Sequence, residues 1–262
     1  MRALYTAATG MMAQELNVQV ISNNIANMRT TGYKRQRAEF QDLLYEHVRR
    51  IGTQTSDQGN ILPVGVDLGS GVKSVGTPRL MTQGTLAQTG ADLDLAIRGE
   101  GFFKVQMPDG TYAYTRDGSF QMDAQGRIVT VQGNVVMPGI TIPQNATGLT
   151  INSQGQVSVT QSGQTTPSVL GQLSLTRFVN KAGLLSIGDN MFTETPASGA
   201  PQDGLPYTDG AGDIQQGNLE QANVEAVSEI SDLIAAQRAY EMNGKVITAA
   251  DQMLSTTTNL MH

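Results

Sequence analysis

The chain has 262 residues and a net charge of −6, from 17 basic and 23 acidic residues with no Lys/Arg block, which argues against a nucleic-acid groove. It contains no cysteine, which excludes disulfides and thiolate metal sites, and no apolar run approaches the roughly 18 residues of a membrane span. Twenty-nine glycines beside 6 Phe, 7 Tyr and no Trp favour short strands and turns over a large enzyme core.

The first predicted element is a helix over residues 2–28. Its apolar side chains recur at every seventh position, the spacing of a helix that packs lengthwise against another helix. These seam positions are Leu4, Met11, Val18 and Ile25. Thr30, Thr31 and Gly32 are expected to end the helix, with Gly32 in a left-handed conformation. The segment lacks a continuous apolar stretch and a cleavage site, so it does not look like a general secretory signal.

Residues 31–91 are predicted to form an extended linker that contains a long hairpin or an exposed loop, with disorder as the alternative. An apolar cluster that includes Tyr45 is followed by turn-forming residues around Gly52 and Gly59, and the stretch ends near Pro63. Short apolar steps then lead toward the middle of the chain.

Residues 92–217 are predicted to form a β-rich middle domain, an all-β sandwich or a partly open barrel. Short apolar runs alternate there with turn signals such as Pro108-Asp109-Gly110 and Asp117-Gly118. The end of this domain, from Thr195 onward, is expected to be a return connection of small residues. Residues 218–223 then lead to the last helix.

The last predicted element is a helix over residues 224–262. Its seam positions, again seven apart, are Leu233, Tyr240, Ile247 and Leu254. Residues 1–30 and 224–262 are therefore predicted to pair as a coiled coil in one terminal helical domain, which gives an α+β fold. The alternative is two ordinary amphipathic helices on a globular core. Many seam positions bury little surface, so we expect both termini to be weakly ordered until they pack against other copies.

Two motifs carry a resemblance. Asn24-Ile25-Ala26-Asn27 followed by Thr30-Thr31-Gly32-Tyr33-Lys34 could be a generic helix cap, but together with the run from Gln237 to Asn243 it resembles the bacterial flagellar rod and hook protein family. The matching positions are Asn24, Ala26, Asn27, Thr31, Gly32, Tyr33, Lys34, Gln237, Arg238, Ala239, Tyr240, Glu241 and Asn243. The stretches Gly99–Phe103 and Tyr114–Phe120 are similar to the middle domain of that family.

The resemblance implies a structural subunit of the distal rod, which stacks helically into a rigid hollow drive shaft that transmits torque from motor to hook. It implies that Tyr45 to Pro63 contributes rigidity. The implied partners are copies of the chain itself in a helical tube, proximal rod proteins, the hook protein and basal-body ring proteins. The implied location is the periplasmic rod of the basal body, reached by flagellar export without cleavage. A proximal rod or hook paralogue is the nearest alternative.

An enzyme is the alternative from another class. The histidines are His47 and His262, and no His/Cys/Asp cluster has metal-ligand spacing. Asp92 and Asp94 alternate on one expected strand face, a pattern more often solvated than catalytic. We therefore expect no catalytic residue, metal or cofactor. A carbohydrate-binding or peptidoglycan-cleaving β protein with helical arms is the competing hypothesis.

Overall fold

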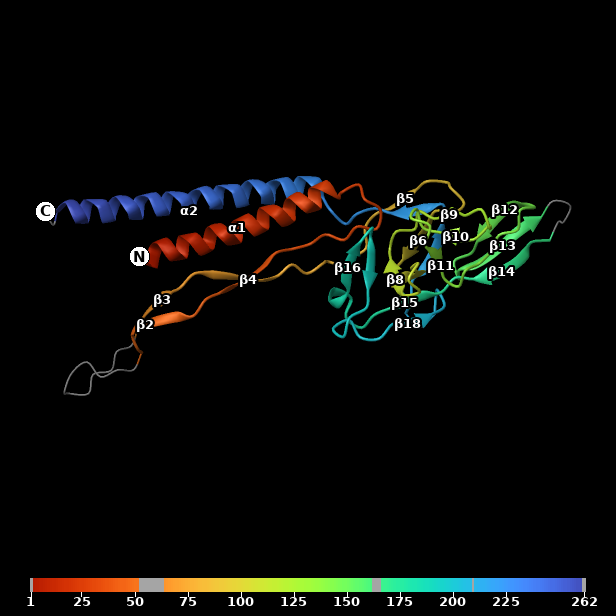
Figure 1. Cartoon of the computed structure of the whole chain (residues 1–262), viewed down its shortest axis with the longest axis horizontal. Helices are drawn as coiled ribbons and strands as arrows, with labels where there is room; N and C mark the ends of the chain where they lie inside the picture. Colours follow the sequence, from red (N-terminus) through yellow and green to blue (C-terminus); the bar gives the residue numbers. More distant parts are fainter. Residues whose placement is uncertain (1, 52–63, 162–165, 209, 261–262) are drawn as a thin grey trace. The chain divides into compact units, whose positions relative to one another are not determined.

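The computed structural model describes residues 2–51, 64–161, 166–208 and 210–260 (Figure 1). The chain divides into two compact units. The helical unit comprises the described parts of Met1–Ile25, Gln36–Pro78 and Glu225–His262. The β unit comprises the described parts of Ala26–Arg35 and Arg79–Val224. The α+β organisation with a helix at each end and a β-rich middle is confirmed, whereas the domain limits predicted from the sequence stay a prediction.

The helical unit is built on two long helices from opposite ends of the chain. They are α1, Arg2–Ala26, and α2, Ala226–Leu260, and they run side by side in opposite directions (Figure 1). Both are rich in Ala, Leu, Met and Gln, which have high helix propensity. α1 ends two residues earlier than predicted. There the amide of Thr30 bonds to the carbonyl of Asn27 (3.0 Å) and its hydroxyl bonds to the Asn27 side chain (3.2 Å), so the chain forms a turn instead.

The segment that follows α1 in the sequence forms an antiparallel β ribbon, which belongs to the helical unit. Strand β1, Glu39–Asp42, pairs with β4, Val72–Gly76, and β2, Tyr45–Arg49, pairs with β3, Val66–Gly69, both antiparallel. The ribbon meets α1 where the amide of Val72 donates to the hydroxyl of Thr9. All residues of β2 and β3 are exposed, so this part of the ribbon has no core of its own.

The β unit contains sixteen strands and one short 3-10 helix in its described residues, and every strand pair is antiparallel. The largest sheet has the order β16-β17-β8-β7-β11-β10-β9, with β15 beside β7 and β18 beside β15. Smaller sheets are β12-β13-β14, β19-β6 and β20-β5. The elements are β5 Leu86–Gln88, β6 Leu95–Arg98, β7 Phe102–Gln106, β8 Tyr112–Thr115, β9 Gln121–Met122, β10 Ile128–Val129, β11 Val135–Val136, β12 Ala146–Ile151, β13 Gln156–Gln161, β14 Ser168–Gln172, β15 Leu175–Arg177, η1 Lys181–Gly183, β16 Leu185–Gly188, β17 Met191–Thr193, β18 Gln202–Gly204, β19 Asp213–Gln216 and β20 Asn218–Glu220.

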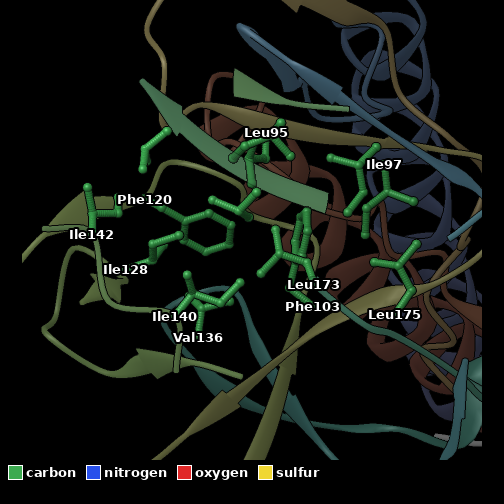
Figure 2. Close-up of a cluster of buried hydrophobic side chains, with 14 residues drawn as sticks. Leu95, Ile97, Phe103, Phe120, Ile128, Val136, Ile140, Ile142, Leu173 and Leu175 are labelled. Carbon is green, nitrogen blue, oxygen red and sulfur yellow. The ribbon is translucent and has the colours of Figure 1, made fainter. Parts of the chain in front are cut away.

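Strand β7 lies between two apolar cores. Successive side chains of a strand point to opposite faces, and Phe102 and Phe103 accordingly enter different clusters. Phe103 packs edge-on against Phe120, 5.0 Å between ring centres, in the larger core (Figure 2). Phe102 packs against Phe178 and Phe192 in the smaller one. Both faces of the sheet are therefore buried at this strand.

The structure differs from two expectations for the middle of the chain. The apolar run 170–178, whose residues predict one strand, forms parts of two strands, because the amide of Leu173 bonds to the carbonyl of Gly155 (2.8 Å) and the chain changes partner there. The expected return connection after Thr195 contains strands β18 and β19. Its small residues gave no strand pattern in the sequence.

Candidate assembly surface and buried ion cluster

The contact between the two helices is made by small and polar residues. Asn24 of α1 donates from Nδ2 to Oε2 of Glu229 on α2 (3.1 Å), and both residues are 1% exposed. Gly10 faces Asn243 so closely that an added Cβ would lie 2.9 Å from its Nδ2. Fourteen residues back along α1, from Asn24 to Gly10, match fourteen forward along α2, so the helices are antiparallel. Ala236 lies midway between Glu229 and Asn243, on the same side of α2.

Most of the predicted seam residues lie at the margins of the buried surface. Half-buried positions are Leu4, Met11, Val18, Ile25, Leu233 and Ile247. Tyr240 and Leu254 are 45% and 42% exposed. The fully buried apolar residues of the two helices are instead Ala7, Ala13, Val20, Ile21, Ala236 and Ala250. The seven-residue spacing is present on α2, but the line that meets α1 consists of small and polar side chains. Regular coiled-coil packing stays a prediction.

Both helices also expose large apolar side chains. On α2 these are Val227, Ile230, Ile234, Met242, Val246 and Met253, and on α1 they are Tyr5 and Met12. Such a series exceeds the scattered apolar residues of an ordinary surface and indicates a face that another surface covers.

The first family motif begins with a three-way junction at Asn24 in the helical unit. Its Nδ2 donates to the carbonyl of Gln36 (2.9 Å), and its Oδ1 accepts from the amide of Gln36 (2.9 Å). Together with the bond to Glu229, one buried amide side chain joins α1, α2 and the chain segment that enters the ribbon.

The rest of this motif belongs to the β unit. After Ala26, which ends α1, Asn27 receives the bonds from Thr30 described above. The carbonyl of Thr31 accepts from the side chain of Asn190 (2.9 Å). Gly32 has a φ of 68°, as predicted, and a Cβ there would lie 2.7 Å from the backbone nitrogen of Asp117. Its amide donates to the carbonyl of Glu220 (2.8 Å), so only glycine fits this close approach.

Next to Gly32 the chain buries Tyr33 and a cluster of three charged side chains, Lys34, Glu220 and Arg116. Lys34 Nζ lies 2.6 Å from one carboxylate oxygen of Glu220, and Arg116 Nη1 lies 3.1 Å from the other. The three side chains are 0%, 0% and 3% exposed. We call this group the ion cluster.

Backbone groups complete the ion cluster. Lys34 Nζ donates to the carbonyl of Thr82 (2.8 Å), Arg116 Nη2 donates to that of Gly99 (2.6 Å), and the amide of Gly84 donates to Glu220 (2.9 Å). Burial lowers the pKa of the Lys34 amino group, and Arg116 acts in the same direction while Glu220 opposes both. One carboxylate thus balances two buried cations. Removing the carboxylate should therefore destabilise the cluster more than removing one of the cations.

Sequence reasoning singled out Lys34 but assigned no role to Arg116 or Glu220. Arg116 was visible only as part of the stretch Tyr114–Phe120. The partners are 186 residues apart for Lys34 and Glu220, and 104 for Arg116 and Glu220. No local pattern in a single sequence indicates pairs at such separations.

The second family motif lies on α2. Gln237, Tyr240 and Glu241 line a groove of about 440 Å³ together with Glu15, Val18 and Gln19 of α1. Asn243 contacts Gly10, and Ala239 is half-buried. Arg238 is exposed. The motif therefore contributes to the helix contact and to an open groove beside it.

Of the four residues predicted for the rigidity segment, only Tyr45 lies within the described residues. It begins β2 and is 53% exposed. Gly52, Gly59 and Pro63 lie outside the described residues. The role of this segment stays a prediction.

The two carboxylates considered for catalysis do not lie on one strand face, because the chain turns there and β6 begins only at Leu95. Asp92 is exposed in this turn, and Asp94 accepts a hydrogen bond from Thr89. Within the described ranges, no three His, Cys, Asp or Glu side chains are placed to hold a metal ion. A search of the same ranges found no helix that is both long and apolar enough to cross a membrane.

The two ends of the chain meet as paired helices, and the helices expose a series of large apolar side chains. These features are typical of a structural subunit. Residues 4–34 match the family described as flagella basal body rod protein. Residues 96–159 match the flagellar hook protein FlgE/F/G D1 domain, and residues 215–260 match the flagellar basal body rod FlgEFG protein C-terminal domain. The ion cluster takes one residue from each of these three segments.

Full-length relatives agree with these matches. The flagellar basal-body rod protein FlgG of Caulobacter vibrioides is 56% identical over 260 residues, which cover 99% of each chain. FlgG of Agrobacterium fabrum is 50% identical over 255 residues, 97% of each chain. FlgF of C. vibrioides is 36% identical over 249 residues, 94% of this chain and 91% of that protein. The chain belongs to the family of flagellar basal-body rod and hook proteins.

Proposed function

We propose that this rod-family chain is the subunit of the distal rod, which assembles helically into a rigid hollow shaft that transmits torque from motor to hook. The single observation that carries the choice within the family is the identity to FlgG, 56%, against 36% to FlgF of the same organism. A proximal rod or hook paralogue is therefore the weaker alternative.

In the proposed assembly the terminal helices of many copies pack lengthwise as coiled coils and build the inner wall. The exposed apolar series on α1 and α2 supports this, because water-facing side chains of this size gain about 25 cal/mol for each Å² that a neighbour covers. A contact between two different faces of a subunit does not close on itself and extends into a filament.

The ribbon is the proposed source of rigidity. An isolated two-stranded ribbon is marginally stable in water, and β2 and β3 are exposed along their whole length. Neighbouring copies in a tube would hold it in place. The β unit, which has its own cores, would form the outer layer.

The family also supports proposals on location and partners. The subunit would be exported by the flagellar route without cleavage and would form the periplasmic rod that reaches the outer membrane. Its neighbours there would be proximal rod proteins, the hook protein and the basal-body ring proteins. A non-enzymatic role follows from the same family argument.

The test changes one half-buried seam residue. Ile247→Asp should abolish tube formation by purified protein, because a carboxylate cannot be buried in a helix seam without a partner. The β unit should remain folded by circular dichroism. Val179→Asp, at a 79% exposed position of the β unit, is the matched control and should assemble normally.

Assembly would be followed by electron cryomicroscopy of concentrated protein and by light scattering of the dilute sample. Tubes whose inner wall consists of α1 and α2 are the expected result. Normal tubes formed by Ile247→Asp would contradict the proposed role of the helices. Compact monomers at every concentration would favour the ligand-binding β protein instead.

A further inference from the structure

The β unit has a small cavity beside its larger core. The cavity measures about 190 Å³, and its apolar walls include Leu93, Met122 of β9, Ile142 and Leu149 of β12. Ile142 is itself a member of that core (Figure 2). Pockets for drug-sized ligands begin at roughly 300 Å³. This cavity therefore has room for a single side chain.

Asp92 determines which kind of side chain fits the cavity. It lies on the lining, and its exposed carboxylate forms no hydrogen bond or ion pair with any residue that the structure describes. Its backbone carbonyl accepts from Nε2 of Gln216 (2.9 Å), which holds the residue in place. Apolar walls beside one carboxylate match a side chain with an apolar body and a donor at its tip, as in tyrosine, lysine or arginine.

Tyr207 is such a side chain, and it points into solvent. It lies between β18 and β19, is 71% exposed and has a φ of 68°, which is a genuine outlier for a bulky residue. Its amide donates to the carbonyl of Gly212 (3.0 Å), and its hydroxyl bonds to none of the described residues. Strained residues of this kind cluster at binding sites, where the surrounding fold imposes the conformation.

Arg98 places a positive charge next to Tyr207. Two of its five donors bond to the carboxylate of Asp213 (3.0 and 2.9 Å), and its side chain is 61% exposed. The bonds and charge of Asp213 raise the pKa of Arg98, and the phenol of Tyr207 acts in the same direction. The ring and the guanidinium are therefore close enough to meet one carboxylate together.

Tyr207 cannot fill the cavity of its own chain. Arg98 and Gln216 lie at opposite ends of the four residue pairs that join β6 and β19, about 10 Å apart. Tyr207 is attached beyond the first end through Gly212, and Asp92 is attached beyond the second through Gln216. Side chains of the larger core lie between them. A Tyr207 that fills the cavity must therefore belong to a second molecule.

We infer that Tyr207 of one copy enters the cavity of a second copy and donates its hydroxyl to Asp92 there, with Arg98 beside the same carboxylate. The opposite charges favour this pairing over a wrong partner. Ring and cavity lie at different ends of the β6–β19 pair, so each contact leaves one of each free and continues from copy to copy. This inference rests on the proposed self-assembly and names a contact between β units.

The first experiment uses the absence of native cysteine and leaves Tyr207 in place. Leu205 lies in the same turn and is 46% exposed, while Thr147 and Met122 lie on the β12 and β9 sides of the cavity. Two variants are made in the full chain, Leu205→Cys with Thr147→Cys and Leu205→Cys with Met122→Cys. Under mild oxidation at assembling concentrations, one of them should give a ladder of disulfide-linked oligomers. Single cysteine variants cannot extend beyond a dimer.

The matched control is Leu205→Cys with Leu185→Cys. Leu185 is 58% exposed, close to the 54% of Met122, but it lies on β16, at the opposite edge of the large sheet from β9. This variant should give no ladder. A ladder equal to that of the test variants would mean that the cysteines meet at random, and it would overturn the inference.

The second experiment tests the carboxylate in the variant that forms the ladder. Asp92→Asn should lower the linked fraction about tenfold, because a hydrogen bond to a charged group and an ion pair are lost. Asp189→Asn makes the same change of charge at an exposed turn of the β16 edge, where asparagine tolerates the φ of 51°, and it should leave the fraction unchanged. Equal fractions for both variants would contradict the role of Asp92.

The third experiment separates binding from folding. Tyr207→Gly should abolish the ladder, whereas the denaturation midpoint of the β unit should stay the same or rise, because glycine adopts a positive φ without strain. A purely structural tyrosine would lower the midpoint instead. An unchanged ladder would overturn the inference.

This contact and self-assembly fail in different ways. Tubes formed by the unaltered protein, with no ladder from either test variant or with a lysine or arginine in the cavity by electron cryomicroscopy, would overturn the contact alone. An unaltered protein that stays monomeric at every concentration would overturn both.

Discussion

The two units of this chain bury different kinds of side chain. The β unit closes two cores around large residues such as Phe102, Phe103 and Leu175, each at most 1% exposed. The helical unit buries mainly alanines and leaves larger apolar residues such as Ile234 and Met242 exposed. Burying a large apolar side chain stabilises by about 1.5–3 kcal/mol, and an alanine contributes much less. The β unit therefore has a large apolar core of its own, while the helical unit leaves apolar surface that neighbouring copies would cover in the proposed assembly.

The largest expected effect is on the ion cluster of the β unit. Glu220→Gln leaves Lys34 and Arg116 buried without their anion and should lower the free energy of unfolding by about 3–5 kcal/mol in chemical denaturation. Lys34→Met leaves one cation and one anion paired and should cost clearly less. Equal losses for both variants would show that the cluster is not organised around the carboxylate.

The larger core of the β unit gives the next effect. Leu175→Ala removes a fully buried side chain beside β7 and should cost about 3 kcal/mol, because a cavity remains. Val169→Ala, at an exposed position, is the control and should change little. A comparable loss for both would argue against a tightly packed core.

A smaller effect is expected in the helical unit. Asn24→Ala removes the side chain that satisfies Gln36 and Glu229, and it should cost about 1–3 kcal/mol of local stability. Hydrogen exchange should speed up in α1 and α2 and stay unchanged in the β unit. Ser22→Ala, an exposed neighbour, is the control. Equal acceleration in both units would mean that the units unfold together.

The pH dependence of the free energy of unfolding should distinguish the two units further. The pKa of Lys34 is lowered by burial, so between this lowered value and 10.5 the unfolded chain binds more protons than the folded one. The free energy of unfolding of the β unit should therefore rise with pH through this window. The rise should be absent in Lys34→Met, compared with the unaltered protein in parallel denaturation series. An identical slope in both proteins would contradict it.

The smallest effect concerns Ile234, an exposed apolar residue of α2. Ile234→Ala should change the stability of the monomer by less than about 0.5 kcal/mol, because the side chain is half exposed. It should raise the concentration needed for assembly, measured by light scattering. A large loss of monomer stability would show that Ile234 packs within the chain.

Apolar periodicity and turn-forming residues predicted the terminal helices and the β-rich middle, because these elements depend on residues that are close in the sequence. The sevenfold spacing located α1 and α2 to within a few residues, and Gly32 was correctly expected to have a positive φ. The centre of the helix contact was less visible, because Gly10 and Asn243 carry no apolar signal. The ion cluster was invisible, since it depends on which distant strands lie side by side. Tertiary pairing, and not local preference, decides such contacts.

The bond between Asn24 and Glu229 spans 205 residues of sequence. A chain that emerges amino end first can fold its β unit as soon as β20 is available, whereas α1 must wait for α2, the last element to appear. Contacts between residues so far apart in the sequence form late, because the long stretch of chain between them must first be closed into a loop. In the proposed assembly, the exposed apolar face of α2 that would contact other copies is therefore completed last, so a partly made chain would lack the surface it needs to polymerise.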